Sequence, residues 1–423
     1  MVSSIETPIL AADGTPLRKS LDRSLRRQKL RALVLIAPLL IFIFVAFVMP
    51  IVSMLLRSIE NDIVAKTLPE TITSLQGWDA ETGELPDEAV FAAFAADIKR
   101  AALAKVHTKV GLRLNYEKSG IASLFKKTAR KAKRWDIEND GPFKEKLIKI
   151  HKNWESVETW QTIKIHGSQY TTGYFLNAVD MRKTPNGPNW QPEDKQILLV
   201  LFKRTLIMSL VITFSCFALG YPIAWLLANL PMRQANLLMI LVLLPFWTSL
   251  LVRTSAWKVM LQQQGVINDI LVYLGMVSND ARLILINNET GTIIAMTHIL
   301  LPFMILPMYS VMQTIPQSYL RAAKSLGATN WTAFWRVYFP QSVPGIGAGS
   351  ILVFILAIGY YITPEIVGGT KGVFISNRIA YHILESLNWG LAAALGTILL
   401  LAVLVLYWTY DRIVGIDNVK LGG

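Results

Sequence analysis

The sequence predicts an all-α integral membrane protein with six transmembrane helices and a large insertion between the first and the second. Of the 423 residues, 52% are hydrophobic and only 17% are charged, whereas a soluble protein carries about 25% charged residues. Several uncharged apolar runs reach the length of about 20 residues that a helix needs to span a bilayer. A long polar stretch, 58–196, interrupts these runs.

The first apolar run covers 32–56 and predicts a transmembrane helix at 32–57. It is longer than the apolar core of a signal peptide, which is about 7–15 residues, and no small-residue cleavage site follows it, so we expect an uncleaved anchor. The stretch 18–31 before it holds seven Lys or Arg and one Asp. The positive-inside rule places the basic N-terminal tail, 1–31, in the cytoplasm.

The insertion, 58–196, is therefore expected on the outer side of the membrane. Its acidic residues gather at 79–97 and its basic residues at 99–134, but long loops cross a membrane largely regardless of charge. We favour the simpler interpretation, in which the insertion is a solvated cap over the membrane part. The alternative is a docking surface for an external partner.

Within the insertion, the sequence predicts helices at 88–106 and 121–134 and strand-like alternation in parts of 158–181. Three histidines are too scattered to suggest a metal site, and we expect none. Aromatic side chains supply enough apolar surface for a small packed unit. The histidines are His107, His151 and His166, and the aromatic residues are Trp154, Trp160, Tyr170, Tyr174 and Phe175.

The membrane part, 197–415, holds the other five predicted spans. With six spans, the tail 416–423 is expected in the cytoplasm. The loop 315–340 is expected on the same side, and the loop 254–288 on the outer side. The five spans are expected within 205–232, 234–252, 290–309, 341–363 and 387–410.

The loop between the fourth and fifth spans has the signals of two short helices. Pro316 suits the first position of a helix, because its missing N–H is no loss there. Gly327 suits the left-handed residue that ends a helix. Thr329 or Asn330 can cap a second helix, which we expect to stop at Pro340. The product is a rigid knob on the cytoplasmic face, suited to a groove in a partner.

The residues of this knob carry a resemblance to a known family. The spacing of its small and apolar residues resembles the EAA loop of the permease subunits of ABC-type importers, which inserts into a cleft of the cytoplasmic ATPase. The leading Glu of that family is Arg321 here, which puts any Glu-specific contact in doubt. The candidate coupling residues are Arg321, Ala322, Ala323, Gly327, Ala328, Phe334, Trp335 and Pro340.

Other segments resemble the spermidine/putrescine group of these permeases, and the likeness covers 30–57 and 200–415. The resemblance implies a type I importer permease fold in a bacterial inner membrane, with both termini cytoplasmic. It implies a second permease subunit in a heterodimer, two ATPase subunits that bind ATP and Mg²⁺, and a periplasmic solute-binding protein. The solute would be a polyamine or another small polar compound. The segments are 220–228, 243–257, 265–268, 297–310 and 359–369.

The residues themselves give little support to other classes of function. No GxxxxGK[ST] phosphate-binding loop is present, so we expect neither an enzyme nor a cofactor in this chain. The net charge of +13 is better explained by the basic tail and one basic loop than by nucleic-acid binding. The one cysteine, Cys216, excludes an intrachain disulfide.

The main alternative is an ion-coupled secondary transporter, which often places ionisable residues near the middle of the membrane. His298 is the one such group well inside a span, apart from Cys216. It is either a pathway residue or a histidine bonded to a neighbouring helix, and we favour the latter. Glu365, at the outer end of the fifth span, is either a ligand for a cationic solute or an interfacial carboxylate. The small residues at 345–350 favour packing within one subunit over a sliding contact with a second permease.

Overall fold

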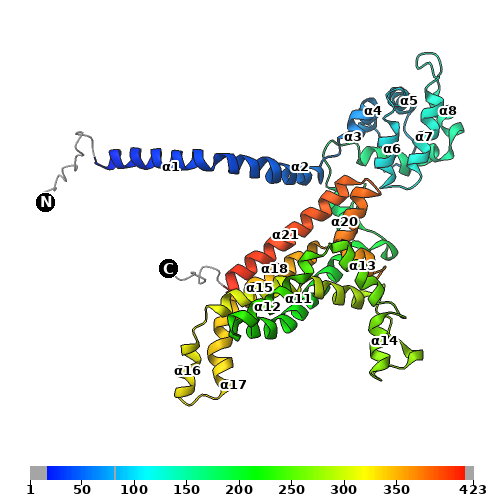
Figure 1. Ribbon diagram of the computed structural model, residues 1–423. Helices are drawn as coiled ribbons and strands as arrows, with labels where there is room; N and C mark the ends of the chain where they lie inside the picture. Colours follow the sequence, from blue (N-terminus) through cyan, green and yellow to red (C-terminus); the bar gives the residue numbers. More distant parts are fainter. Residues whose placement is uncertain (1–16, 81, 415–423) are drawn as a thin grey trace. The chain divides into compact units, whose positions relative to one another are not determined.

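The computed structural model describes residues 17–414 except 81. It separates into two compact units, residues 1–57 and 58–423, which are treated one after the other (Figure 1). Within the described residues, the regular secondary structure is helical except for one antiparallel hairpin of β1 (Met181–Thr184) and β2 (Gly187–Trp190). The tail 416–423 and residues 1–16 lie outside the described residues.

The first unit is a helix of the length and composition of a membrane span. It consists of α1 (Leu17–Ile43), the π-helical turn η1 (Phe44–Val48) and α2 (Met49–Arg57). The π turn ends two residues before Pro50. Proline has no N–H and its ring pushes against the preceding turn, so a local change in the hydrogen-bond pattern is expected there.

The insertion forms a small helical domain around a buried aromatic cluster. Phe94 and Trp154 lie 4.5 Å apart between ring centroids, and Trp154 and Trp160 lie 5.3 Å apart. All three are fully buried, so the expected packed unit is confirmed. Its helices are α3 (Asp62–Thr67), α4 (Pro69–Gln76), α5 (Glu88–Leu103), α6 (His107–Asn115), α7 (Ile121–Ala132), α8 (Phe143–Ile150), η2 (Lys152–Glu155), α9 (Val157–Ile165), α10 (Gly173–Ala178) and η3 (Glu193–Lys195).

One secondary-structure prediction for the insertion is wrong. The expected strand alternation at 158–181 is instead the helices α9 and α10, and the chain becomes a strand only from Met181. Trp160 and Ile163, three residues apart, are both fully buried, which is the spacing of one helix face. Packing of that face on the aromatic cluster outweighs the local preference of the β-branched residues.

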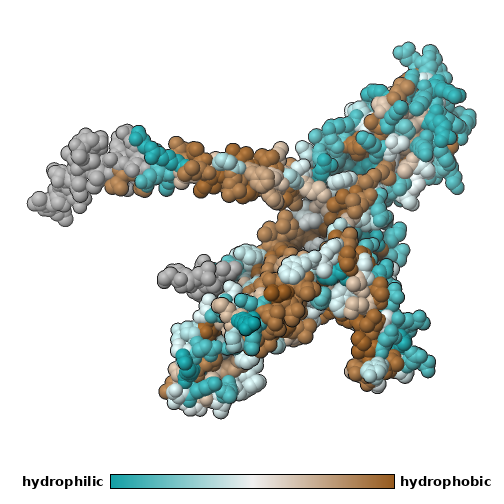
Figure 2. Space-filling model, viewed as in Figure 1, coloured by the Kyte–Doolittle hydropathy of each residue, from teal (hydrophilic) through white to brown (hydrophobic). Residues whose placement is uncertain are grey.

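The rest of the second unit is a bundle of apolar helices. On the face shown in Figure 2, hydrophobic side chains cover this bundle and hydrophilic side chains cover the insertion. The helices are α11 (Leu198–Asn229), α12 (Met232–Leu243), η4 (Leu244–Trp247), α13 (Leu250–Met260), α14 (Val266–Tyr273), η5 (Asn279–Ala281), α15 (Glu289–Gln313), α16 (Gln317–Ser325), α17 (Asn330–Ala333), η6 (Phe334–Tyr338), α18 (Phe339–Gly359), α19 (Ile362–Val367), α20 (Ile375–Leu384) and α21 (Trp389–Val414).

Five helices of the described chain are long and apolar enough to span a membrane, and a bent pair makes a sixth candidate. The expected third span, 234–252, is not one straight helix. It is the pair Met232–Trp247 and Leu250–Met260, which meet at 95°. Pro245 in η4 cannot donate a backbone hydrogen bond, so the α-helix is interrupted there.

Contacts between helix ends show that the bent pair still carries the chain across the bundle. The Gln317 side chain donates to the Asn229 side chain at 2.7 Å, so the end of α11 lies beside the start of α16. Arg204, near the start of α11, pairs with Glu289 at the start of α15 at 3.6 Å. The segment from Asn229 to Glu289 therefore crosses from the first end, called here the loop end, to the second, called the insertion end.

The insertion is attached to the insertion end. The Asp180 carboxylate accepts hydrogen bonds from the backbone N–H groups of Leu198 and Leu199 and so caps α11. The Tyr116 hydroxyl donates to the carbonyl oxygen of Ser386 at 2.5 Å. The insertion and the loop 315–340 therefore lie at opposite ends of the bundle.

The small residues of α18 pack within the chain, as the sequence indicates. A Cβ at Gly349 would approach Met304 Sδ on α15 to 2.9 Å, and one at Gly345 would approach Val311 Cβ to the same distance. Small residues allow such close approach of helices in a membrane. The prediction of packing inside the subunit is therefore confirmed for these two glycines.

Candidate coupling loop and pathway site

The first half of the loop is a short helix that ends in a tight turn. Helix α16 follows Pro316, which is its capping residue rather than its first helical residue. At the other end, the N–H of Gly327 donates to Lys324 and the N–H of Ala328 donates to Ala323, both at 3.0 Å. These two bonds form the Schellman motif, and Gly327 has the expected left-handed φ of +87°.

The turn needs glycine for its backbone conformation and not for space. A Cβ on Gly327 would meet no atom within 4 Å. A left-handed conformation costs an L-residue other than Gly, Asn or Asp about 1–2 kcal/mol. The angle between the two halves of the loop therefore depends on the backbone freedom of this one residue.

The second half of the loop is continuous with a membrane span. Thr329 is the cap, since its hydroxyl oxygen accepts from the N–H of Thr332 at 3.2 Å. The expected stop at Pro340 is wrong, because helix runs without interruption from Asn330 to Gly359. The π turn η6 ends two residues before Pro340, the same offset as at Pro50 in the first unit. The changed bonding accommodates the proline, and the loop becomes the end of the fifth span.

The loop exposes a larger apolar surface than the sequence indicated. Trp335 is 44% exposed, but Phe334 is half-buried and packs within the chain, stacked on Tyr338. Leu326 and Trp331 are 89% and 71% exposed, and neither was among the candidate coupling residues. The i, i+4 spacing of Trp331 and Trp335 places both on one helix face and could have revealed the second residue.

The remaining coupling candidates lie on the exposed surface of α16 or in its turn. Arg321 and Ala322 are exposed, and Ala323 and Ala328 are half-exposed and hold the Schellman bonds. Within the described chain, no carboxylate pairs with Arg321. The position of the family's Glu is therefore occupied here by a cation that faces outward.

His298 is bonded to a neighbouring helix, the interpretation favoured above. The indole N–H of Trp257 on α13 donates to His298 Nδ1 at 3.1 Å, and the two rings lie 5.3 Å apart. Nδ1 therefore acts as an acceptor. The histidine fastens the second half of the bent pair to α15.

Glu365 opens onto a cavity of 450 Å³ at the insertion end. Asn377 Nδ2 donates to Glu365 Oε2 at 2.6 Å, which orients the carboxylate. Tyr361, Tyr381 and Glu385 line the same cavity, and Arg378 adds one cation. Carboxylates and aromatic faces both attract organic cations, but the sequence did not point to these partners, because they come from two different helices. His298 does not line this cavity.

The described residues contain no group of three or more His, Cys, Asp or Glu that could hold a metal ion. The loop offers an exposed apolar surface on a rigid angle, and the cavity offers carboxylates and aromatic rings.

Comparison with known proteins identifies the region that contains both sites. Residues 204–415 match the family described as "Binding-protein-dependent transport system inner membrane component". The match begins after the insertion ends.

Three curated relatives are 32–37% identical to this chain over the aligned residues. The spermidine/putrescine transport system permease protein PotB of Salmonella typhimurium is 37% identical over 213 residues, which are 50% of this chain and 74% of that protein. PotB of Escherichia coli K12 is 36% identical over 213 residues, 50% of this chain and 77% of that protein. The inner membrane ABC transporter permease protein YdcU of E. coli K12 is 32% identical over 236 residues, 53% and 74% of the two chains.

The likeness to solved structures is weaker, at 18% identity. A bacterial alginate ABC transporter in complex with a pentasaccharide-bound periplasmic protein contains a chain 18% identical, with a TM-score of 0.41, covering 51% of this chain and 77% of that one. The MetNI methionine ABC transporter in an inward-facing conformation gives 18% identity and a TM-score of 0.41, covering 53% and 99%.

Proposed function

The chain belongs to the family of binding-protein-dependent transport system inner membrane components, and from this premise we propose that it carries a polyamine or another small polar compound. It is a transmembrane permease subunit of an ATP-driven importer and not an enzyme, since ATP hydrolysis belongs to a partner ATPase. The comparisons support this function and not that of an ion-coupled secondary transporter.

Permeases of this family work with ATPase and solute-binding partners. For this chain we propose a heterodimer with a second permease, two ATPase subunits that bind Mg²⁺ and ATP, and a periplasmic solute-binding protein. The loop is the proposed ATPase contact, because its residues Leu326, Trp331 and Trp335 expose apolar surface. An exposed apolar patch with a polar rim is typical of a protein–protein contact.

The proposed orientation in the inner membrane places the loop end in the cytoplasm. The stretch 18–31, with seven Lys or Arg and one Asp, precedes the first span and is expected to remain cytoplasmic. The insertion that follows this span then lies on the other side, and the loop end, opposite the insertion, faces the cytoplasm. The insertion is then periplasmic and both termini are cytoplasmic.

The observation that carries the mechanism is the continuous helix Asn330–Gly359. The Schellman turn at Gly327 fixes α16 against the start of this helix. If the ATPase moves the loop, the helix transmits that movement along the fifth span. ATP can favour one state of the pathway only through contacts that differ between the two states, and the exposed loop surface supplies such contacts.

The proposed solute class follows from the PotB relatives and from the cavity at Glu365. This cavity adjoins the end of the same fifth span and carries Glu365 and Glu385 with two tyrosines. A polyamine is an organic polycation. The carboxylates would bind its ammonium groups directly, and the faces of the tyrosine rings would attract the same cationic groups.

Reconstitution tests the proposal. The chain is purified with its partner ATPase, second permease and binding protein and is placed in proteoliposomes. We expect uptake of labelled spermidine or putrescine that requires ATP and the binding protein and persists without an ion gradient. Uptake that follows a proton or sodium gradient and ignores ATP would contradict the proposal.

A further inference from the structure

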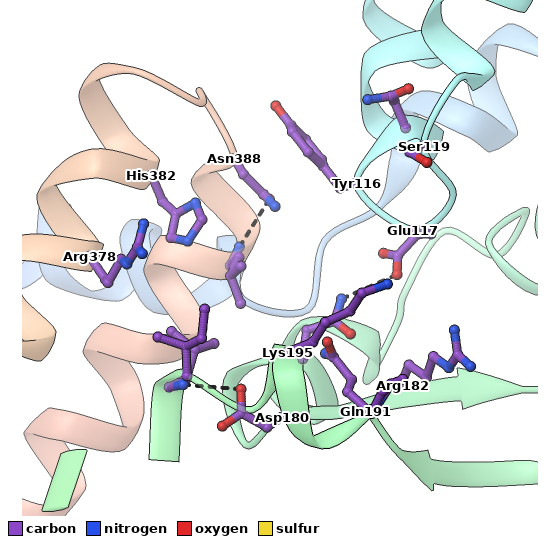
Figure 3. A pocket seen from close by; sticks show the side chains of 16 residues that line it. Tyr116, Glu117, Ser119, Asp180, Arg182, Gln191, Lys195, Arg378, His382 and Asn388 are labelled. Atoms are coloured by element: carbon purple, nitrogen blue, oxygen red, sulfur yellow. Dashed lines mark hydrogen bonds between the residues drawn. The ribbon is translucent and has the colours of Figure 1, made fainter. Parts of the chain in front are cut away.

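A second cavity lies where the insertion meets the membrane helices. Its volume is 420 Å³, and its walls come from the segment after α6, from the residues around η3, from α20 and from the start of α21. The segment from α10 to β1 adds Asp180 and Arg182 to the wall. In Figure 3, Arg378 and His382 project from one side, and Lys195 and Gln191 lie on the other. The cavity is distinct from the one at Glu365, although Arg378 lines both.

The two carboxylates in its wall are already occupied. Glu117 accepts from Arg113 Nη1 at 2.7 Å and from Asn177 Nδ2 at 3.2 Å. Asp180 uses one oxygen for the N–H of Leu198, at 3.1 Å, and the other for that of Leu199, at 2.7 Å. Both negative charges are therefore compensated inside the fold, Glu117 by a guanidinium and Asp180 by a helix N-terminus.

The cations in the wall have no such compensation. Within the described chain, no carboxylate lies within ion-pair distance of Lys195 or Arg378. The Arg378 guanidinium lies 5.4 Å from the centre of the Tyr381 ring, which leaves its N–H groups available. The uncompensated charge of the cavity is positive, and its free groups are donors.

Asn388 adds a donor in an almost fully buried position. It is only 6% exposed, and its Oδ1 accepts from the N–H of Leu391 at 3.3 Å, so the carbonyl side is used to cap α21. Among the described residues nothing accepts a hydrogen bond from its NH₂ group, which belongs to a residue that lines the cavity. The Nδ2 atom is not among the fully buried, unpartnered atoms of the described residues, so it is open to the cavity and can donate to an anion bound there.

The position of the cavity indicates which anion is available. Leu198 and Leu391, at the beginnings of two membrane spans, form part of its wall. Leu384, Leu387 and Trp389 beside it are 69%, 54% and 42% exposed. A cationic pocket between span ends, with apolar surface and a tryptophan next to it, matches the phosphate and the upper acyl chain of a phospholipid.

We propose that this cavity binds the phosphate of an anionic phospholipid from the leaflet at the insertion end, with Lys195, Arg378 and the Asn388 NH₂ group as its donors. The lipid would connect α20 and α21 to the last residues of the insertion. The inference depends on the membrane location of the chain and not on the identity of the solute.

Lipid titration of the purified, delipidated chain in detergent tests the proposal. Phosphatidylglycerol is added, and its binding is followed by native mass spectrometry and by the melting temperature. We expect phosphatidylglycerol to raise the melting temperature and to bind at least tenfold more tightly than phosphatidylcholine or inorganic phosphate. Equal binding of inorganic phosphate would show that the site takes a free anion and would overturn the lipid assignment.

Two variants separate the cavity from general surface charge. Lys195→Gln with Arg378→Gln should weaken phosphatidylglycerol binding at least tenfold, whereas the matched pair Lys126→Gln with Lys127→Gln on the exposed face of α7 should not. Asn388→Asp keeps the oxygen that caps α21 but replaces the donor with a negative charge, so it should abolish binding while the lipid-free melting temperature is retained. Unchanged binding in both cavity variants would overturn the proposal.

Discussion

Tyr221 in the last third of α11 meets Phe334 of the coupling loop edge to face, with ring centroids 6.2 Å apart and ring planes at 88°. The Tyr221 hydroxyl also lies 3.1 Å from Ser342 Oγ on α18. One side chain thus contacts the π turn and the regular helix that follows it. Tyr221 therefore holds the start of the fifth span against the second span.

Removing this contact should uncouple the loop from the bundle. Tyr221→Ala deletes an aromatic pair worth about 0.5–1.5 kcal/mol beyond its buried area and frees Phe334. We expect solute-stimulated ATP hydrolysis with uptake reduced several-fold, measured in the same proteoliposomes. Tyr221→Phe keeps the ring and loses only the hydroxyl contact, so it should stay close to the wild type. If both variants transport normally, the contact has no coupling role.

The angle of the loop should depend on the left-handed residue at its centre. Gly327→Val adds about 1–2 kcal/mol of backbone strain without a steric clash, and the turn should relax by changing shape. We expect loss of ATPase co-purification or of ATP-dependent uptake, with an unchanged melting temperature of the bundle.

Asparagine provides the matched control for this position, since it adopts left-handed conformations more easily than other non-glycine residues. Gly327→Asn should retain most of the coupling that Gly327→Val loses. Equal loss in both variants would mean that the side chain, and not the backbone angle, disturbs the contact.

The sequence predicts the loop well where short-range rules decide it. Gly327 and Thr329 adopt the expected roles, because a helix end and a helix cap depend on hydrogen bonds within a few residues. The same short-range rules wrongly predict that the second helix stops at Pro340. Its ring is accommodated by a π turn that ends two residues earlier, and no rule about the proline itself predicts where that turn lies.

The sites away from the loop could be predicted only in part. Glu365 was identifiable as a carboxylate near a span end, but Asn377, which orients it, and Glu385, which shares its cavity, follow a chain reversal. The cavity with Lys195 and Arg378 joins residues that are far apart in sequence. A single sequence contains no signal for these long-range contacts, because they depend on how the insertion packs on the helix ends.

The exposed tryptophans should supply most of the apolar contact with the ATPase. Large exposed aromatic side chains often dominate an interface, and truncation of such a residue costs about 2 kcal/mol or more. We therefore expect Trp331→Ala with Trp335→Ala to lower ATPase affinity more than tenfold in a pull-down titration. Trp190→Ala, an equally large deletion at an exposed site in the insertion, is the control and should have no effect. Undiminished affinity of the double variant would place the contact elsewhere.

Glu365 should matter for a cationic solute, and His298 should not act as a proton relay. Glu365→Gln keeps the size of the side chain and its contact with Asn377 but removes the charge. We expect at least a tenfold loss of spermidine uptake, with basal ATP hydrolysis unchanged. Normal spermidine uptake by Glu365→Gln would remove this residue from the pathway.

His298→Gln should leave the dependence of uptake on ATP intact.

The insertion contains a buried polar cluster that makes its stability depend on pH. Burial lowers the pKa of His166 to about 4 despite the nearby Glu117 carboxylate. Burial alone would raise the pKa of Glu117, but His166 and Arg113 bring it below its ordinary value. Both folded-state pKa values are depressed, so the unfolded chain binds more protons than the folded one on acidification, and stability is lost as the pH falls.

For His166 the loss begins below its ordinary pKa of 6.5 and continues to about 4, while Glu117 adds to it below 4.5. Linkage predicts that the insertion loses about 2 kcal/mol of stability between pH 7 and pH 5. Hydrogen exchange of α6 and α9 peptides in the full chain, corrected for the chemical exchange rate, measures this difference. His166→Gln cannot titrate, so its exchange protection should be nearly the same at the two pH values whatever its absolute stability. A wild-type chain whose α6 and α9 are protected equally at pH 5 and pH 7 would show that His166 is not held neutral by burial.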